Sequence, residues 1–282
     1  MVVLKTIAET RSACARIRAE NKTLGLVPTM GALHHGHLSL VHAAQAACDV
    51  VVVSIFVNPT QFGPREDYAS YPRDFGQDCR TLEGAGVDLV FAPSVEEMYP
   101  AGASTFVEVG GLSDRLDGAS RPGHFRGVAT VVAKLLNIFE PERAFFGQKD
   151  AAQVAVLRKM VRDLLFAVQL EVCPTVREAD GLAMSSRNRN LSTEQRRQAL
   201  VLSRALLAVE KQFQSGEHDP SKLLAQALRV ISEEPTVEVD YLRAVDPLTL
   251  EDVTDVRRGT LVAVAARVGS TRLIDNLLLP SA

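Results

Sequence analysis

Leu26-Val27-Pro28-Thr29-Met30-Gly31-Ala32-Leu33-His34-His35-Gly36-His37 is the stretch that decides the fold and the candidate site. The apolar residues before Pro28 predict a strand over 23–27, which we expect Pro28 to end because proline cannot donate to a neighbouring strand. Small and apolar residues over 38–48 predict a helix directly afterwards. A strand, a glycine-containing turn and a helix N-terminus favour an anion site, because the first backbone N–H groups of a helix are free.

Three of the six histidines fall within this stretch. His34 and His37 are three residues apart, so a helix would bring their imidazoles to one face. The pair could donate to a phosphate, bind a metal ion or be structural. The metal interpretation lacks a third ligand and the glutamate of a metalloprotease helix, so we favour phosphate donation.

The chain predicts an α/β fold, a Rossmann-like doubly wound parallel sheet followed by a smaller C-terminal α+β domain with a short antiparallel sheet. The run 50–57 is dominated by β-branched residues, as in strands buried on both faces. Further strands are expected at 88–92, 105–109 (an edge strand), 144–146 and 167–172, with helices at 4–20, 75–85, 128–139 and 151–164. We predict domains at 1–175 and 176–282. The second has helices at 194–214 and 221–232 and strands at 237–244, 260–268 and 271–277, the last two forming a hairpin.

Composition narrows the functional classes. The 282 residues carry a formal net charge of −3 with a pI near 6.1, which gives no global attraction to nucleic acid or to an anionic membrane. Four dispersed cysteines fit reduced thiols. The longest apolar runs are strand-sized and no leader pattern opens the chain, so we expect a cytoplasmic protein that binds small molecules.

Other candidates follow the predicted strands. Gln61 comes after the second strand, at the sheet edge where ligands gather. Lys149 follows a later strand and could reach a phosphate or be merely exposed. Asp150 with Gln153 has capping-box spacing, so Asp150 could cap the next helix. Gln153, one turn further on, would point to the same opening at the sheet edge.

Two further groups leave alternatives open. Ser185, Ser186 and Arg187 suit oxyanion binding but could form a plain solvated loop. Asp78 could bind Mg²⁺ together with phosphates, or could simply favour the first turn of its helix.

Taken together, six segments resemble the pantothenate synthetase family. They are Pro28 to His37, Phe56-Val57-Asn58-Pro59-Thr60-Gln61-Phe62, Tyr71-Pro72-Arg73, Arg121 to Val128, Phe146-Gly147-Gln148-Lys149-Asp150 and Arg177 to Asn188. The resemblance implies a pantoate–β-alanine ligase that uses ATP and Mg²⁺, forms a pantoyl adenylate, releases AMP and pyrophosphate, and acts as a homodimer.

The resemblance also implies residue roles. The catalytic residues would be His34, His37, Lys149 and Arg187, with His37 as the expected proton donor. ATP would contact Met30, Gly31, Ala32, Leu33, His34, His35, Gly36, His37, Gly147, Gln148, Lys149, Asp150, Val176, Met184, Ser185, Ser186 and Arg187. Pantoate and β-alanine would contact Met30, Gln61 and Gln153, with Val131 beside the geminal methyls, and Asp78 would bind Mg²⁺.

Two rival functions remain at this point: a nucleotidyltransferase that leaves AMP on its product, and a non-catalytic nucleotide-sensing module. Both would explain the phosphate motifs, but neither explains the paired glutamines Gln61 and Gln153.

Overall fold

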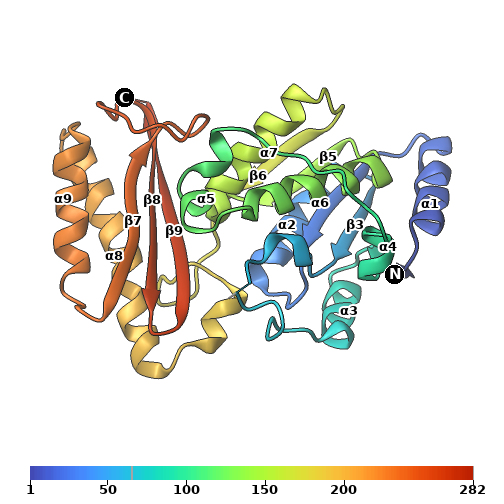
Figure 1. Ribbon diagram of the computed structural model, residues 1–282, viewed down its shortest axis with the longest axis horizontal. Coiled ribbons are helices and arrows are strands. Elements are labelled where there is room, and N and C mark those ends of the chain that lie inside the picture. The colour runs from blue at the N-terminus through green and yellow to red at the C-terminus, as the bar shows by residue number, and fades with distance from the viewer. Residues whose placement is uncertain (65, 282) are drawn as a thin grey trace.

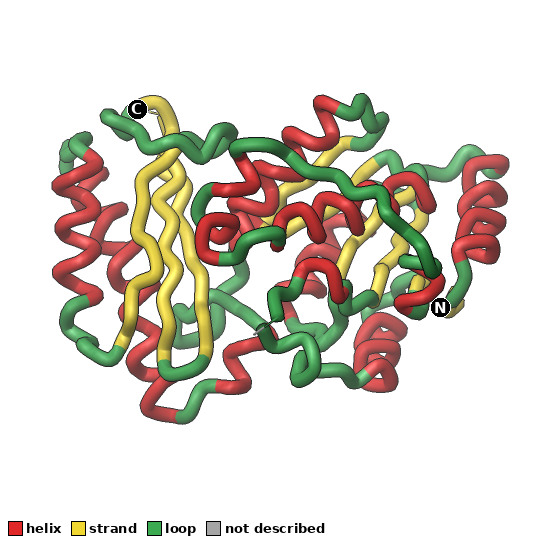
Figure 2. Tube along the Cα trace, viewed as in Figure 1, coloured by secondary structure: helices red, strands yellow, loops and turns green. Residues whose placement is uncertain are grey.

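The computed structural model describes residues 1–64 and 66–281 and contains two sheets side by side (Figures 1 and 2). The larger sheet has six strands, each parallel to its neighbours. In spatial order they are β1 (Val2–Leu4), β4 (Leu89–Phe91), β3 (Val50–Ile55), β2 (Leu24–Thr29), β5 (Arg143–Gly147) and β6 (Gln169–Cys173). The predicted parallel α/β sheet is therefore confirmed.

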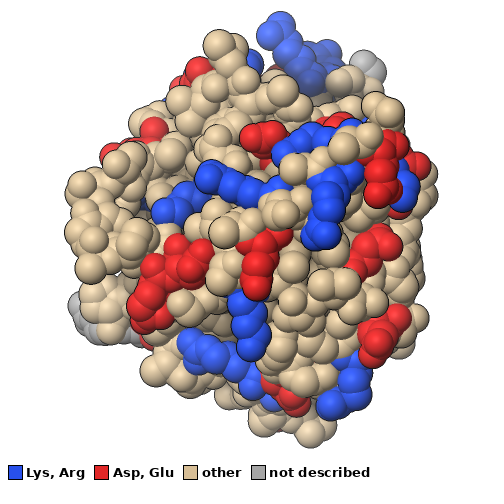
Figure 3. All heavy atoms as spheres, turned by 90° about the vertical axis from the view of Figure 1, so that its right-hand side faces the viewer, with Lys and Arg blue, Asp and Glu red and all other residues tan. Residues whose placement is uncertain are grey.

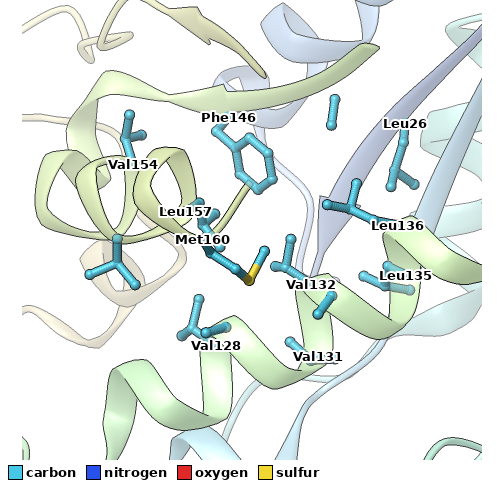
Figure 4. Close-up of a cluster of buried hydrophobic side chains, with 14 of the residues drawn as sticks. Leu26, Val128, Val131, Val132, Leu135, Leu136, Phe146, Val154, Leu157 and Met160 are labelled. Atoms are coloured by element: carbon cyan, nitrogen blue, oxygen red, sulfur yellow. The ribbon is translucent and has the colours of Figure 1, made fainter. Parts of the chain in front are cut away.

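Helices cover both faces of this sheet. On one face, α1 (Ile7–Ala19), α6 (His124–Phe139) and α7 (Ala151–Asp163) pack against apolar side chains such as Leu26. Figure 4 shows α6 and α7 facing one another around Val128, Leu136, Leu157 and Met160. On the other face, α2 (His35–Ala47) and α3 (Phe75–Gly84) contribute Leu40 and Leu82 to a separate cluster with Val27.

Shorter elements complete this part of the chain. They are α4 (Val95–Met98), α5 (Asp117–Ser120) and the 3-10 turns η1 (Pro59–Gln61), η2 (Leu112–Asp114), η3 (Gln148–Asp150) and η4 (Ser186–Asn190).

The chain leaves β2 and β5 towards opposite faces of the sheet. The connection after β2 enters α2, whereas the connection after β5 enters α7 on the other face. Neighbouring strands whose connections diverge in this way open a crevice beyond their carboxyl ends, where ligands of such sheets bind. The site must therefore be sought at the ends of β2, β3 and β5.

Pro28 does not end the pairing of its strand, so that prediction was wrong. In β2, Pro28 is paired with Ser54 and Thr29 with Ile55. The carbonyl oxygen of Leu24 accepts from Glu142, on the β5 side, whereas that of Thr29 accepts from Phe56, on the β3 side. Successive residues of a strand direct their backbone groups to opposite neighbouring strands, so the nitrogen of Pro28 faces β5. The pairing of β2 with β5 ends at Leu26, so no strand hydrogen bond is lost at Pro28.

The edges of the sheet also differ from expectation. Residues 105–109 form no strand, because the Val107 amide donates instead to the Thr130 hydroxyl of α6, across 2.9 Å. One edge strand is β1, a three-residue strand that sequence reasoning missed and that pairs with β4; the other edge strand is β6. The brevity of β1 hid the alternation by which strands are recognised.

The second sheet is antiparallel and comprises β7 (Val237–Val245), β8 (Arg258–Val268) and β9 (Thr271–Ser281). Val268 pairs with Thr271 across the turn, which confirms the predicted hairpin. The helices α8 (Thr193–Gln214) and α9 (Pro220–Ile231) pack on this sheet, and α8 starts with the expected capping box of Ser192 and Gln195. Side chains of this second part, including Val245 and Leu261, also join the core around α6 and α7.

The surface carries charges of both signs. On the face shown in Figure 3, Lys and Arg side chains are interspersed with Asp and Glu side chains. Among the described residues, none of the helices combines the length and apolar character needed to cross a bilayer.

Candidate active site

Two cavities lie at the carboxyl ends of the parallel strands. The larger, about 690 Å³, extends to the second sheet and is lined by residues that include Asp67, Lys149, Asp150, Gln153, Ser185, Arg187 and Arg272. The smaller, about 190 Å³, is lined by residues that include Met30, His37, Ser54, Asn58, Gln61, Val131 and Gln153. Asp150, Gln153 and Arg187 border both, so the cavities adjoin.

The turn after β2 is shaped by a buried carboxylate. Gly31 and Ala32 both have left-handed backbones, with φ of 79° and 51°. Asp78 of α3 accepts hydrogen bonds from the Ala32 amide at 2.9 Å and the Leu33 amide at 2.8 Å, and is 4% exposed. A Cβ on Gly31 would lie 2.8 Å from the same carboxylate. Asp78 therefore fixes the turn, and because both its oxygens are engaged, the contacts give no support to its predicted role as a magnesium ligand.

The two histidines meet at the start of α2, as predicted. His34 occupies the N-cap position, and its ring stacks on that of His37 with centroids 4.0 Å apart. The His34 backbone amide donates to Nδ1 of His37 across 3.3 Å. In a neutral imidazole whose Nδ1 accepts, the proton is on Nε2, so His37 has its N–H group free for another partner.

Both imidazoles are held neutral. Burial and the nearby charge of Lys149 together lower the pKa of His34 to about 4. Burial, then the neighbouring His34 and Lys149, lower the pKa of His37 to about 3. At neutral pH His37 is thus a hydrogen-bond donor rather than an acid that carries a positive charge. His35, between them, is exposed.

Gln61 is held from several sides. Its side-chain oxygen accepts from Asn58 at 3.0 Å, and its side-chain nitrogen donates to the sulfur of Met30 at 3.2 Å. Its carbonyl oxygen lies 2.8 Å from Nδ1 of His124 and 3.3 Å from a guanidinium nitrogen of Arg121. Burial lowers the pKa of His124 to about 4, so this ring is neutral too.

Asn58 is a site residue that our assignment of roles did not include. It is 1% exposed, and it also donates to the Gly127 carbonyl and accepts from the hydroxyl of Tyr99. At Gly127 a Cβ would lie 2.3 Å from the Thr60 carbonyl oxygen, which explains why glycine stands there. The signal that could have revealed Asn58 was a polar residue directly after the valine-rich run 50–57.

Lys149 and Asp150 lie in η3, at the end of β5. Their charged groups are 3.6 Å apart. Asp150 stands at the N-cap of α7 but makes no side-chain capping bond, so the predicted capping role was wrong. Asn276 of β9, which sequence reasoning missed, donates to the carbonyl oxygens of Gln148 and Lys149 at 3.0 and 2.9 Å. The second sheet thus fixes the turn that carries Lys149.

Ser185, Ser186 and Arg187 form another side of the site. Arg187 makes two 3.0 Å hydrogen bonds to the carboxylate of Asp67, a residue from the loop after η1. The Ser185 hydroxyl accepts from the Arg187 amide, and the Ser186 hydroxyl lies 3.4 Å from that of Tyr71. Arg187 borders both cavities while being held by this loop.

Met184 covers the start of α2. Its sulfur accepts from the Gly36 amide at 3.1 Å, so one free N–H group of the helix is capped by a weak acceptor. Its own amide donates to the Val176 carbonyl at 2.9 Å, which brings the two predicted adenine contacts together.

The family described as Pantoate-beta-alanine ligase matches residues 2–278. A pantothenate synthetase from Acidobacterium capsulatum is 65% identical, covering 98% of this chain and 96% of that protein. The crystal structure of pantothenate synthetase from Thermus thermophilus superimposes with a TM-score of 0.94 at 50% identity, covering 98% of this chain and 99% of the other. That of the pantoate–β-alanine ligase from Francisella tularensis, complexed with β-γ ATP and β-alanine, gives a TM-score of 0.81 at 34% identity, covering 99% and 97%. The chain belongs to the pantothenate synthetase (pantoate–β-alanine ligase) family, whose members condense pantoate with β-alanine using ATP.

Proposed function

We propose that the chain makes pantothenate in two half-reactions within the two adjoining cavities. In the first, a pantoate carboxylate oxygen attacks the α-phosphorus of ATP and the bond to pyrophosphate breaks. In the second, the amine nitrogen of β-alanine attacks the acyl carbon of pantoyl adenylate and AMP leaves. The observation that carries this proposal is that a neutral His37 borders the smaller cavity while Lys149 borders the larger one. Hydrogen-bond donors therefore lie on both sides of the boundary at which the two cavities adjoin.

Pantoate is assigned to the smaller cavity. Its apolar wall includes Val131, which suits the geminal methyl groups, while the amides of Gln61 and Gln153 can both donate to and accept from hydroxyl and carboxylate groups. Met30 and Asn58 keep the Gln61 amide in place. A rigid amide lowers the barrier of the attack more than a mobile one does, because the attacking oxygen must be aligned with the phosphorus.

ATP is assigned to the larger cavity and the start of α2. Negative charge grows around the α-phosphate and on the departing pyrophosphate, and fixed donors aimed at that charge lower the barrier. His34, the Nε2–H group of His37, the amides of His35 and Gly36, and Lys149 would supply these donors, because the amides of Ala32, Leu33 and His34 are already engaged. Ser185, Ser186 and Arg187 would hold the phosphates from the opposite side, with Arg187 leaving Asp67 to do so.

The remaining nucleotide contacts follow the resemblance. Gly147 and Asp150 would contact the ribose, with Gln148 beside them in the ATP site, while backbone groups of Val176 and Met184 would hold the adenine. Met184 would first give up its hydrogen bond with the Gly36 amide, which then becomes free for a phosphate oxygen.

Magnesium would enter bound to the phosphates of ATP. Among residues 1–64 and 66–281, no three His, Cys, Asp or Glu side chains are grouped as a metal site, and Asp78 is occupied by two amides. A protein-built magnesium cage therefore does not fit these residues, and we assign no catalytic step to one.

The organisation of the protein is proposed as follows. Residues 1–175 bind ATP and pantoate, and residues 176–282 help to close the site, because Asn276 from the second part donates to the Gln148 carbonyl and Arg272 lines the larger cavity. We propose a homodimer in the cytoplasm. The extended run 103–109 supports the dimer, since Phe106 is 50% exposed there and no strand pairs with the run within the described parts of the chain.

The test is an assay of AMP release with ATP, Mg²⁺, pantoate and β-alanine, in which each is omitted in turn. We expect free AMP only when all are present. A nucleotidyltransferase would leave AMP on its product, and a nucleotide-sensing module would release none; either result would refute the proposal.

A further inference from the structure

A serine hydroxyl without a partner lies in the wall of the smaller cavity. Ser54 interrupts the valine-rich strand β3 and is 1% exposed. Within the described residues its Oγ makes no hydrogen bond, although its backbone carbonyl accepts from the Thr29 hydroxyl at 2.7 Å. A buried hydroxyl without a partner destabilises the folded state, so the fold alone gives no reason for serine at this position.

The surroundings of Ser54 show what could use this hydroxyl. Ser54 pairs with Pro28 in β2, and the α6 residues Val128, Val131 and Leu135 line the same cavity. Figure 4 shows Val128, Val131 and Leu135 on α6. The side-chain amides of Asn58 and Gln61 are already engaged with one another. Ser54 is therefore a free polar group in a part of the cavity that is otherwise apolar.

We propose that the Ser54 hydroxyl binds the terminal hydroxyl of pantoate and so makes the site selective for an acid that carries this group. The inference rests on the proposed placement of pantoate in the smaller cavity. The carboxylate must face His37 and the nucleotide, and the hydroxyl next to the carboxylate then remains near Gln61 and Gln153. The terminal hydroxyl, at the other end of the four-carbon chain, reaches the apolar end, where Ser54 offers both a donor and an acceptor.

Selectivity follows from the cost of an unpaired group. When pantoate binds, its terminal hydroxyl exchanges water for the Ser54 hydroxyl, and Ser54 gains the hydrogen-bond partner that it lacks in the free protein. An analogue with a hydrogen in place of the terminal hydroxyl would leave Ser54 buried and unpaired, which sites built for a hydroxyl discriminate against strongly.

The experiment compares pantoate with that analogue in the full-length enzyme. We expect Ser54→Ala to lower kcat/KM for pantoate about 10-fold or more, to leave kcat/KM for the analogue unchanged or higher, and to leave KM for ATP unchanged. Its melting temperature should be equal to or above that of the parent, because the variant removes an unpaired hydroxyl. A folding defect would lower kcat/KM for both acids alike, so it can be distinguished from the loss of a contact with pantoate.

Ser113→Ala is the matched control. Ser113 Oγ is likewise buried and makes no hydrogen bond in the described structure, yet Ser113 does not line either cavity. It should not change the preference between the two acids. Equal losses for both acids in Ser54→Ala, or no loss for pantoate, would overturn the inference. Failure of the parent enzyme to release AMP with pantoate would instead refute the proposed function.

Discussion

The backbone amide of His34 donates to Nδ1 of His37 across 3.3 Å, and this one bond determines which nitrogen of His37 carries the proton. Because Nδ1 accepts, Nε2 is the donor, and burial with Lys149 nearby keeps the ring neutral. The turn of the motif thus leaves His37 able to donate a hydrogen bond without first being protonated, as its proposed role at a phosphate oxygen requires.

The first prediction separates the two nitrogens of His37. We expect His37→Ala to lower the rate of adenylate formation by about 10²–10³-fold, as when one oxyanion donor is removed. His37→Gln, whose amide nitrogen can take the position of Nε2, should retain more activity than His37→Asn, whose amide can only replace Nδ1. Rapid-quench measurement of pyrophosphate would check the order, and equal rates for the Gln and Asn variants would contradict the tautomer assignment.

The second prediction concerns pH. The pKa of His34 is lowered to about 4 and that of His37 to about 3 in the folded protein, whereas an unfolded histidine titrates near 6.5. As pH falls below about 6.5, the unfolded chain takes up protons that the folded chain does not, so the free energy of unfolding decreases towards pH 5. Urea unfolding at several pH values should show this decrease, with a shallower slope in His37→Gln.

The third prediction tests the role of Asp78. In Asp78→Asn the amide can accept from only one of the Ala32 and Leu33 amides, so we expect the free energy of unfolding to fall by about 1–3 kcal/mol. KM for ATP should rise as the turn loosens, while the Mg²⁺ concentration needed at saturating ATP stays the same. A selective rise in that Mg²⁺ requirement, with unchanged stability, would instead favour the magnesium role.

The fourth prediction concerns the second sheet. Asn276→Ala removes three hydrogen bonds to the turn that carries Lys149, two that Asn276 donates and one that it accepts from the Gln148 side chain, and should lower kcat about 10-fold or more by misplacing the Lys149 ammonium group. Asn276→Asp keeps an acceptor for Gln148 but lacks the donors, so it should resemble the alanine variant. Steady-state kinetics would test this, and a fully active Asn276→Ala enzyme would show that the first part positions Lys149 alone.

The sequence predicted local features well. The valine run of β3, the helix after the histidines and the capping box at Ser192 depend on neighbours in the chain, and each was found. Pro28 was misread because its effect depends on which neighbour its nitrogen faces, and strand order is not a local property.

The site was predicted only in part, because some of its contacts, like the strand order, are not local along the chain. The structure brings His37, Lys149 and Gln153 to adjoining cavities and stacks His34 on His37, although their roles stay predictions. Asn276 and Asp67 could not be identified as supports, because each acts on a residue from another element. Asn58 was missed although it lies only three residues from Gln61, which it contacts.

The central claim is that pantoate is activated before β-alanine takes part. Its most direct test is a single turnover of the enzyme with ATP, Mg²⁺ and pantoate alone, followed by measurement of pyrophosphate. We predict a full equivalent of pyrophosphate per active site without β-alanine, and no pyrophosphate without pantoate. Pyrophosphate that forms only when both acids are present would contradict the two-step account.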